Sequence, residues 1–263
     1  MSRDELRSCR IMPTRRLTPS HGLALFKLVT SATLLIPVLN EIEGMRIIMP
    51  QVKREWVDQI LVLDGGSEDG TAEYAREQGY EVHVQRERGL RQGYGEMVPL
   101  IRGDILITFS PDGNCIPDLI PALRNKMEEG YDMVVASRYL PPAKSDDDDW
   151  ITAFGNWLFT ATINVLHGGH YTDAMGIYRA YRTRLIQDLE LDKDRWHRTP
   201  EKLLFTRISW EPLLSARAAR RKLKIAEIPG DEPARYGGKR KLQIIQWGAA
   251  YYFQFIRDWL LWR

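Results

Sequence analysis

The sequence is poor in cysteine, and its two cysteines, Cys9 and Cys115, lie far apart. Two cysteines cannot form a disulfide framework, and neither has the paired spacing that is typical of a zinc site. The histidines are scattered as well, and the neighbours His167 and His170 have no further candidate ligands close by. We therefore expect neither structural zinc nor disulfides, and a reducing, cytosolic compartment.

Long hydrophobic runs are missing too. No apolar run reaches the roughly 18–20 residues that a transmembrane helix requires. The short apolar stretch at 22–26 follows Arg15 and Arg16, but Lys27 interrupts it and no clear cleavage site follows. We interpret residues 1–30 as a basic N-terminal extension rather than a signal peptide.

The glycine-rich loops that bind phosphates in many nucleotide-dependent proteins are also absent. Neither Gly-x-x-x-x-Gly-Lys-Ser/Thr nor Gly-x-Gly-x-x-Gly follows an expected strand. This disfavours a dinucleotide-dependent oxidoreductase or a nucleotidyltransferase. What is present, 44% hydrophobic and 27% charged residues over 263 positions, is typical of one globular domain of enzyme size.

The net charge of +2 conceals an uneven distribution. Residues 1–30 carry about +4, residues 215–263 about +7, and the segment between them about −9. Basic ends favour phosphate groups or an anionic membrane surface as partners, although charged surfaces often serve solubility alone. Nucleic acid is not among the partners that we expect.

The first half of the chain alternates strand and helix patterns. Apolar runs predict strands at 33–38, 60–63, 80–84 and 105–109. The predicted helices between them are 44–56 with a break at Pro50, 71–78 closed by Gly79, and 93–101. This βαβα order predicts an α/β fold with a mostly parallel central sheet flanked by helices.

The second half is less regular. Its pattern predicts strands at 133–136 and 223–228 and helices at 119–129, 151–167 and 180–188, the last of these after a short strand. A further helix is predicted at 213–221, capped by Ser209. Residues 141–149 hold two prolines and four consecutive aspartates, which is typical of a mobile loop.

Polar residues follow the fourth strand directly, in the segment Ser110-Pro111-Asp112-Gly113-Asn114. Ligands bind at the carboxyl ends of strands in open α/β sheets. The oxygens of Asp112 and Asn114 could hold Mg²⁺ or Mn²⁺ against a diphosphate. An ordinary Asp-Gly turn is the alternative interpretation.

The first two strands also end in polar residues. Pro37, Asn40 and Glu41 follow one, and Asp64 follows the other with glycines between acidic and hydroxyl groups. Glycines such as Gly66 allow tight turns and close approach of a ligand. Asp64 could accept hydrogen bonds from a base or a ribose, whereas Asp69 and Thr71 are expected as the cap and first turn of the next helix.

These segments occur in an order that resembles family 2 of the inverting glycosyltransferases, which have the GT-A fold, and within it the dolichyl-phosphate mannose synthase-like branch. The resemblance covers roughly residues 31–242. The segments that carry it are 37–41, 64–71, 103–104, 110–114, 137–139, 173–179 and 235–241.

The resemblance implies a role for each matching residue. Asp112, Asp173 and Arg235 would be catalytic, and Asp112 with Asn114 would hold a divalent metal, Mg²⁺ or Mn²⁺. The residues expected to bind the nucleotide sugar are Pro37, Asn40, Glu41, Asp64, Gly66, Arg235, Arg240 and Lys241. The metal and the basic side chains would stabilise the leaving diphosphate. The basic segment 235–241, taken alone, could equally be a solvated loop.

Three positions depart from the family pattern. Ser110 stands where the metal motif Asp-x-Asp has its first carboxylate, so the site has a hydroxyl without charge there. Gly65 replaces a second Asp of many relatives, and Arg240 replaces a Ser. Arg240 would add positive charge near the diphosphate.

The acceptor decides whether a proton acceptor is required. A lipid phosphate is already ionised near neutral pH, whereas a hydroxyl acceptor needs a carboxylate base. Asp173 is the first candidate for that base, and Glu211 is the second. Arg138 and Arg179 could bind an acceptor phosphate or form structural ion pairs.

The C-terminal segment is rich in aromatic residues interrupted by polar ones. This pattern predicts an amphipathic helix that lies on a membrane surface, or one that packs on the domain or on a second copy of the chain. We expect an extension at 1–30, a GT-A domain at 31–242 with a nucleotide-sugar half (31–115) and an acceptor half (116–242), and the helix at 243–263.

Two hypotheses on function follow. The first is a hexosyltransferase that uses a UDP- or GDP-sugar, with a polyprenyl phosphate as a candidate acceptor, in the cytosol or at a membrane surface, as a monomer or homo-oligomer. The second is a degenerate, non-catalytic GT-A fold that serves as a binding partner, and Ser110 motivates it.

Overall fold

The computed structural model describes residues 30–236 and 244–262. Within them a seven-stranded sheet has the order β3-β2-β1-β4-β6-β5-β7. The strands are β1 (Ala32–Val38), β2 (Gln59–Asp64), β3 (Glu81–Val84), β4 (Ile105–Thr108), β5 (Met133–Ser137), β6 (Arg179–Arg182) and β7 (Ile225–Pro229). The α-helices are α1 (Ile42–Ile48), α2 (Thr71–Glu77), α3 (Leu90–Met97), α4 (Leu119–Glu128), α5 (Trp150–His167), α6 (Leu185–Asp188), α7 (Arg198–Leu203), α8 (Glu211–Arg220) and α9 (Ile244–Leu261).

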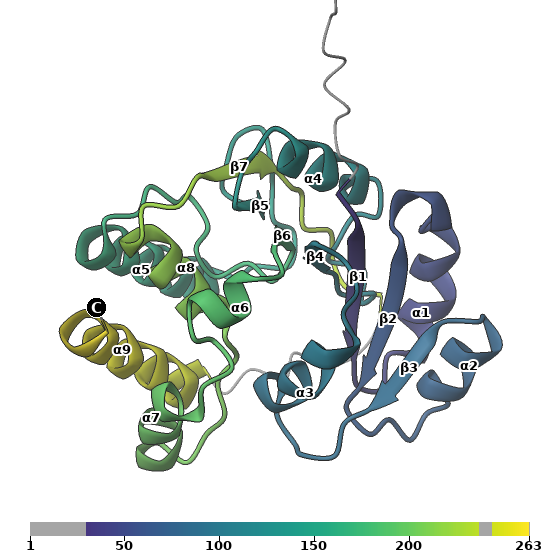
Figure 1. Ribbon diagram of the computed structural model, residues 1–263, viewed down its shortest axis with the longest axis horizontal. Coiled ribbons are helices and arrows are strands. Elements are labelled where there is room, and N and C mark those ends of the chain that lie inside the picture. The colour runs from purple at the N-terminus through teal and green to yellow at the C-terminus, as the bar shows by residue number, and fades with distance from the viewer. Residues whose placement is uncertain (1–29, 237–243, 263) are drawn as a thin grey trace, which may run out of the picture.

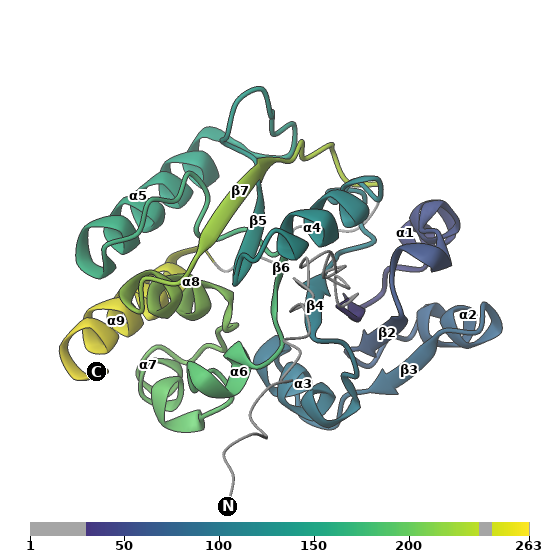
Figure 2. The same ribbon diagram turned by 45° about the horizontal axis from the view of Figure 1, so that its top comes forward.

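Helices cover both faces of the sheet, as Figure 1 and Figure 2 show. One apolar cluster joins β1, β4 and β5 to α1, α2 and α4. The other joins the opposite face of the same strands to α3, α5, α6 and α8, with residues of α9. The central strands β1, β4 and β5 are buried on both faces, which explains why they are continuous apolar runs rather than alternating patterns. The predicted α/β fold with a mostly parallel sheet is confirmed.

The prediction of a helix at 180–188 is wrong in its first part. Residues 179–182 form β6, which runs antiparallel between β4 and β5, and only Leu185–Asp188 is helical. Ala180 and Tyr181 are fully buried and point into the two opposite apolar clusters. The strand forms because two neighbours already supply ladder partners, and this tertiary effect outweighs local helix propensity.

Several helix ends also differ from expectation. Helix α1 stops at Ile48, and Pro50 lies in a 3₁₀ turn that follows it. Helix α3 begins at Leu90 and ends at Met97. Ser209 does not cap α8, because Trp210 occupies that position and the Ser209 hydroxyl instead lies 3.0 Å from the Tyr251 hydroxyl. Gly70, rather than Asp69, is the N-cap residue of α2.

The C-terminal helix α9 packs on the domain along one face. It contacts α5, α7 and α8. Phe255 of α9 and Trp262, the residue after the helix, are buried in the core. Its buried Asp258 forms an ion pair with Arg217 of α8, with a distance of 2.7 Å between Oδ1 and Nη2. Among the described residues, no helix is both long and apolar enough to cross a bilayer.

Candidate active site

The loops after β1 and β2 are joined by hydrogen bonds at the carboxyl ends of their strands. The Asn40 Oδ1 accepts from the Glu68 N–H (2.8 Å), and the Glu41 N–H donates to the Thr71 hydroxyl (3.0 Å). The Ile42 N–H donates to Asp69, whose carboxylate also accepts from Thr71. Pro37 lies in β1 beyond the last residue paired with β4, where its missing N–H breaks no bond on that side.

Asp64 is nearly fully buried, and its carboxylate organises the loop that follows it. It accepts hydrogen bonds from the N–H groups of Gly66 (3.1 Å) and Ser67 (3.0 Å) and from the Ser67 hydroxyl. Gly66 has a φ of 90° and is exposed, so the turn needs a residue without a Cβ. The loop is therefore built around Asp64, and its contact with a base stays a prediction.

The loop after β4 is fixed by two glycines. A Cβ on Gly44 of α1 would lie 2.2 Å from the Pro111 carbonyl oxygen, so α1 packs directly against this loop. Gly113 has a φ of 101°, and the Tyr236 ring lies over its α-carbon. The Tyr236 N–H also donates to the Asp112 carbonyl oxygen (2.9 Å). These contacts hold the Asp112 carboxylate in one place.

Asp112 has two partners. One oxygen accepts from the Asn114 N–H (3.1 Å), and the other lies 3.2 Å from Nη1 of Arg235. Burial opposes the charge of Arg235, but Asp112 and Asp147 together raise the pKa of its guanidinium on balance. The sequence analysis assigned Asp112, Asn114 and Arg235 to one predicted site, and the three residues lie together in the structure.

These three residues line a cavity of about 280 Å³. Its other lining residues come from the ends of β4 and β5 and from the segments after β5, before β6 and after β7. They are Ser110, Cys115, Ala136, Arg138, Met175, Gly176, Ile177, Tyr178, Gly230, Asp231 and Glu232. The other described nucleotide-site candidates, Pro37, Asn40, Glu41, Asp64 and Gly66, do not line it. Arg240 and Lys241 lie outside the described residues.

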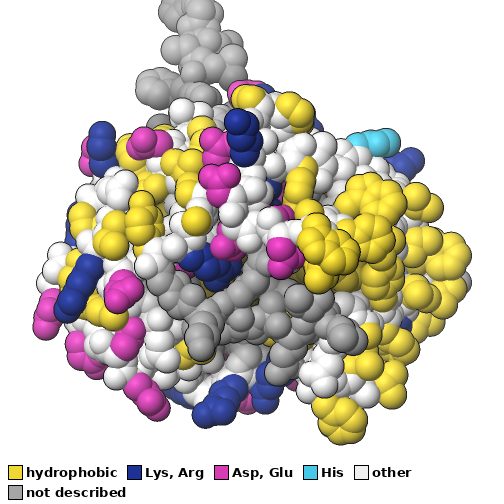
Figure 3. Space-filling model, turned by 180° about the vertical axis from the view of Figure 1, so that it is seen from behind, with side chains coloured by type: hydrophobic (Ala, Val, Ile, Leu, Met, Phe, Trp, Pro, Cys, Tyr) yellow, Lys and Arg dark blue, Asp and Glu magenta, His cyan; other side chains and the backbone are white. Residues whose placement is uncertain are grey.

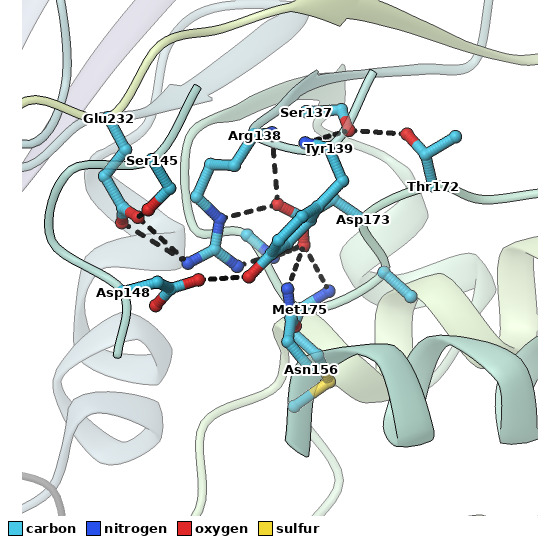
Figure 4. Close-up of polar contacts among 12 residues, drawn as sticks. Ser137, Arg138, Tyr139, Ser145, Asp148, Asn156, Thr172, Asp173, Met175 and Glu232 are labelled. Atoms are coloured by element: carbon cyan, nitrogen blue, oxygen red, sulfur yellow. Dashed lines mark hydrogen bonds and ion pairs between the residues drawn. The ribbon is translucent and has the colours of Figure 1, made fainter. Parts of the chain in front are cut away.

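Arg138 is the centre of an ion-pair cluster in this cavity (Figure 4). Its guanidinium lies 2.7 Å from Oδ2 and 3.1 Å from Oδ1 of Asp173, and 3.3 Å from Oε1 of Glu232. Burial tends to raise the pKa of Asp173, but the nearby Arg138 lowers it on balance. Asp173 is therefore held as an anion, and a carboxylate with a lowered pKa is a weak proton acceptor.

The four-aspartate segment is bonded to residues that line the cavity, and the structure does not test the predicted mobility. The Asp146 N–H donates to the Glu232 carbonyl (2.8 Å), and the Ser145 hydroxyl bonds the Glu232 carboxylate. Asp148 bonds the Tyr139 hydroxyl, and Asp149 caps α5 by accepting from the Thr152 N–H (2.8 Å). The Asp147 carboxylate contacts Asn114 and Arg235.

Two residues proposed for the acceptor lie in the core instead. Arg179 is fully buried, and its guanidinium donates to the carbonyls of Ala174, Gly176 and Glu211 and to the Ser215 hydroxyl. Within the part of the chain that the structure describes, Arg179 forms no ion pair and does not line the cavity, because carbonyls and a hydroxyl accept from its guanidinium. Glu211 is also buried and does not line the cavity.

The composition of the site suits a hard divalent cation. Within 30–236 and 244–262, no group of three or more His, Cys, Asp and Glu side chains could hold a metal ion alone. However, Oδ1 of Asn114 is buried and has no hydrogen-bond partner among the described residues. A buried amide oxygen beside a carboxylate is the kind of ligand that Mg²⁺ and Mn²⁺ accept, with phosphate oxygens and water completing their coordination.

The fold, with a polar site at its strand ends, is the GT-A fold of glycosyltransferases. Residues 33–190, more than half of the chain, match Glycosyl transferase family 2, and the chain belongs to that family. It is a glycosyltransferase, which confirms the enzyme class of the first hypothesis, whereas the donor, the acceptor and inversion stay predictions.

Two curated relatives have a lipid phosphate in their names. The chain is 28% identical to an undecaprenyl-phosphate mannosyltransferase of Micrococcus luteus over 60% of this chain and 69% of the relative. It is 29% identical to a dolichyl-phosphate hexose transferase of Haloferax volcanii over 73% and 77%, respectively. The match to Glycosyltransferase AglJ of Haloferax volcanii, at 28% identity over 61% of this chain, spans only 53% of that protein's length.

Solved structures share the GT-A fold. Mannosyl-3-phosphoglycerate synthase from Rubrobacter xylanophilus superposes with a TM-score of 0.63 at 19% identity, over 90% of this chain and 77% of that one. Glucosyl-3-phosphoglycerate synthase from Mycobacterium tuberculosis, in complex with Mn²⁺, UDP and phosphoglyceric acid, gives 0.61 at 19% identity, over 88% and 78%. At these identities the likeness establishes the fold alone.

Proposed function

We propose that the protein transfers a hexose from a UDP- or GDP-sugar to a polyprenyl phosphate with inversion at the anomeric carbon. The proposal is based on the cavity at the carboxyl ends of β4 and β5. Asp112, Asn114, Arg138 and Arg235 all line this cavity. The names of the curated relatives support a lipid phosphate as acceptor.

The donor would lie across the strand ends. In this proposal Pro37, Asn40 and Glu41 border the nucleoside and Asp64 reaches the base. Arg235, with Arg240 and Lys241, faces the diphosphate. Positive groups close to a leaving diphosphate act where charge develops in the transition state, which is where electrostatic stabilisation is most effective.

Asp112 and Asn114 would hold the divalent metal. The unpartnered Asn114 Oδ1 and the buried Asp112 carboxylate supply two oxygen ligands, and Mg²⁺ typically takes only one or two carboxylates besides phosphates and water. A bound Mg²⁺ or Mn²⁺ would neutralise charge on the diphosphate leaving group.

The state of Asp173 favours an acceptor that needs no general base. Its carboxylate is paired with Arg138, and its pKa is lowered on balance although burial alone would raise it. An ionised phosphate can attack without losing a proton, whereas a hydroxyl acceptor would require a stronger base. In this proposal Arg138 meets the acceptor phosphate, and Asp173 orients the Arg138 guanidinium.

Helices α5 and α9 support contact with a lipid bilayer. Helix α5 exposes large apolar side chains and buries polar ones. Phe154 and Trp157 are 58% and 62% exposed. The polar side chains of Asn156, Thr160 and His167 are buried. Helix α9 likewise exposes an apolar set (Ile256, Trp259, Leu260 and Leu261). In Figure 3 the hydrophobic side chains gather on the side of the molecule that carries these helices. Exposed apolar areas with tryptophan are typical of interfacial binding.

The transfer reaction tests the proposed function directly. Purified protein with Mn²⁺ is incubated with UDP- and GDP-hexoses, each with and without a polyprenyl phosphate, and nucleotide release and glycolipid are measured. We expect acceptor-dependent release with one donor, and a loss of about 100–1,000-fold in Asp112→Ala. The exposed Asp118→Ala is the matched control. Failure to bind any of these donors, or full activity of Asp112→Ala, would overturn the assignment.

Vesicle flotation tests the bilayer contact. We expect the full chain to float with anionic liposomes and a Phe154→Ser/Trp157→Ser variant to remain at the bottom of the gradient, since each change removes exposed apolar surface. A variant that still floats would locate the contact elsewhere. The cytosolic location and a homo-oligomer stay predictions.

A further inference from the structure

Ser110 leaves the metal motif with one carboxylate, yet a second carboxylate lies beside Asp112 in space. Asp147, in the segment between β5 and α5, accepts a hydrogen bond from Nδ2 of Asn114 (2.9 Å) and contacts Nε of Arg235 (3.1 Å). The same guanidinium contacts Asp112 through Nη1 (3.2 Å). Asp112 and Asp147 therefore flank one cation, the guanidinium of Arg235.

The orientation of the Asn114 amide gives an independent observation. Its Nδ2 donates to two carboxylates, Asp147 and Glu232 (3.3 Å), and carboxylates only accept. This network fixes which end of the amide is nitrogen. The opposite end, Oδ1, is then a buried acceptor with no donor among the described residues, in a side chain that is only 9% exposed and lines the cavity. A cation would satisfy it.

The charge balance around the cavity also calls for a cation. Among the described residues, the guanidinium groups of Arg138 and Arg235 are already paired with four carboxylates, those of Asp112, Asp147, Asp173 and Glu232. Each of these carboxylates would repel the phosphates of a donor that enters the cavity. A divalent ion between the carboxylates and the phosphates would remove that repulsion.

We propose that Asp147 supplies, from a different loop, the carboxylate that Ser110 lacks, so that Asp112, Asn114 and Asp147 together bind the divalent cation. The cation competes with the Arg235 guanidinium for the same two carboxylates. Cation binding therefore releases Arg235 for the diphosphate. The inference rests on the proposed function for the role of the metal, but it concerns metal binding, which is measured without any sugar transfer.

The test is Mn²⁺ binding to the full chain without nucleotide, by calorimetry and by loss of the free-Mn²⁺ paramagnetic resonance signal. We expect Asp147→Asn to weaken binding by about tenfold or more, and the neighbouring exposed Asp146→Asn to match the wild type. Arg235→Met should bind Mn²⁺ more tightly, because it removes the competing cation. Circular dichroism and thermal unfolding confirm that each variant is folded.

A second carboxylate in the motif makes the test sharper. We expect Ser110→Asp to raise Mn²⁺ affinity more in the Asp147→Asn background than in the wild type, because both carboxylates would serve one ion. Equal gains in the two backgrounds, or wild-type affinity of Asp147→Asn, would overturn the inference even if sugar transfer needs Mn²⁺ and Asp112. Conversely, dependence of Mn²⁺ binding on Asp147 without any sugar transfer would overturn the proposed function alone.

Discussion

Two groups of carboxylates lie at the same edge of the sheet and are neutralised in different ways. In the loops after β1 and β2, Asp64 and Asp69 accept hydrogen bonds from backbone N–H groups and from hydroxyls of Ser67 and Thr71. Around the cavity, the carboxylates are paired with arginines. These are Asp112 and Asp147 with Arg235, and Asp173 and Glu232 with Arg138.

The difference separates a preformed side of the site from an exchangeable one. Hydrogen bonds within the 64–71 loop and to the neighbouring loop shape that region with or without a ligand. Ion pairs between segments far apart in the chain can be exchanged for a metal ion or a phosphate. We therefore expect the nucleoside side to be rigid in the free protein and the diphosphate side to rearrange when the donor binds.

The strongest test of this comparison is Arg138→Ala. It leaves the buried Asp173 carboxylate without its cation, and breaking a buried ion pair in this way typically costs about 3–5 kcal/mol of unfolding free energy. The matched control is Arg102→Ala, which breaks an exposed pair with Glu81 and should leave the unfolding free energy nearly unchanged, because solvent screens that pair. Urea unfolding measures both, and equal losses would remove the distinction between the two kinds of carboxylate.

The second test extends the comparison to pH. Burial, aided by Arg220, lowers the pKa of His167 to about 4, and burial with Arg91 lowers the pKa of His197 to about 3. Both histidines stay neutral in the folded protein, while the unfolded chain takes up protons below pH 6.5, the ordinary value. These two histidines should therefore leave the stability unchanged above that pH and lower it as the pH decreases toward 4.

The measured quantity is the slope of the unfolding free energy against pH. For two such histidines the slope reaches up to about 2.7 kcal/mol per pH unit. Urea unfolding at pH 7, 6 and 5 should show a flatter profile for His167→Gln/His197→Gln than for the wild type. The half-buried His83, on β3, is the control, and its Gln variant should keep the steep profile. Parallel profiles for the double variant and the wild type would contradict the prediction.

The smallest effect is expected for Asp64→Ala. It leaves the N–H groups of Gly66 and Ser67 without their acceptor, at a cost of about 1–3 kcal/mol. The exposed Glu68→Ala, in the same loop, should be close to neutral. Because no arginine is involved, the loss should be the same at low and high salt. A loss that shrinks with salt would place this loop among the ion-paired regions.

The parallel half of the fold could be predicted because its strands are local apolar runs that end in turn residues. Strand β6 could not, since the segment Arg179–Arg182 becomes a strand only through its position between β4 and β5. Helix α7, which no apolar period marks, was missed entirely.

The site was predictable where a motif holds its residues close together, as for Asp112 and Asn114. The roles of Glu232 and Asp147 were missed, because their partners lie more than 30 residues away in the chain. The run of four aspartates was the available signal, and it was interpreted as a mobile loop. The prediction that Arg179 binds an acceptor phosphate or forms an ion pair was wrong. The sequence does not indicate that backbone carbonyls will accept hydrogen bonds from its guanidinium.

The close packing of Gly44 against the Pro111 carbonyl has a consequence for motion. The backbone of helix α1 at Gly44 packs directly against the backbone of the loop at 110–114, and no side chain lies between them at this point. We therefore expect them to move together. The same loop is bound from its other side by Tyr236, whose N–H donates to the Asp112 carbonyl, so a displacement of the 110–114 loop would also have to break this hydrogen bond.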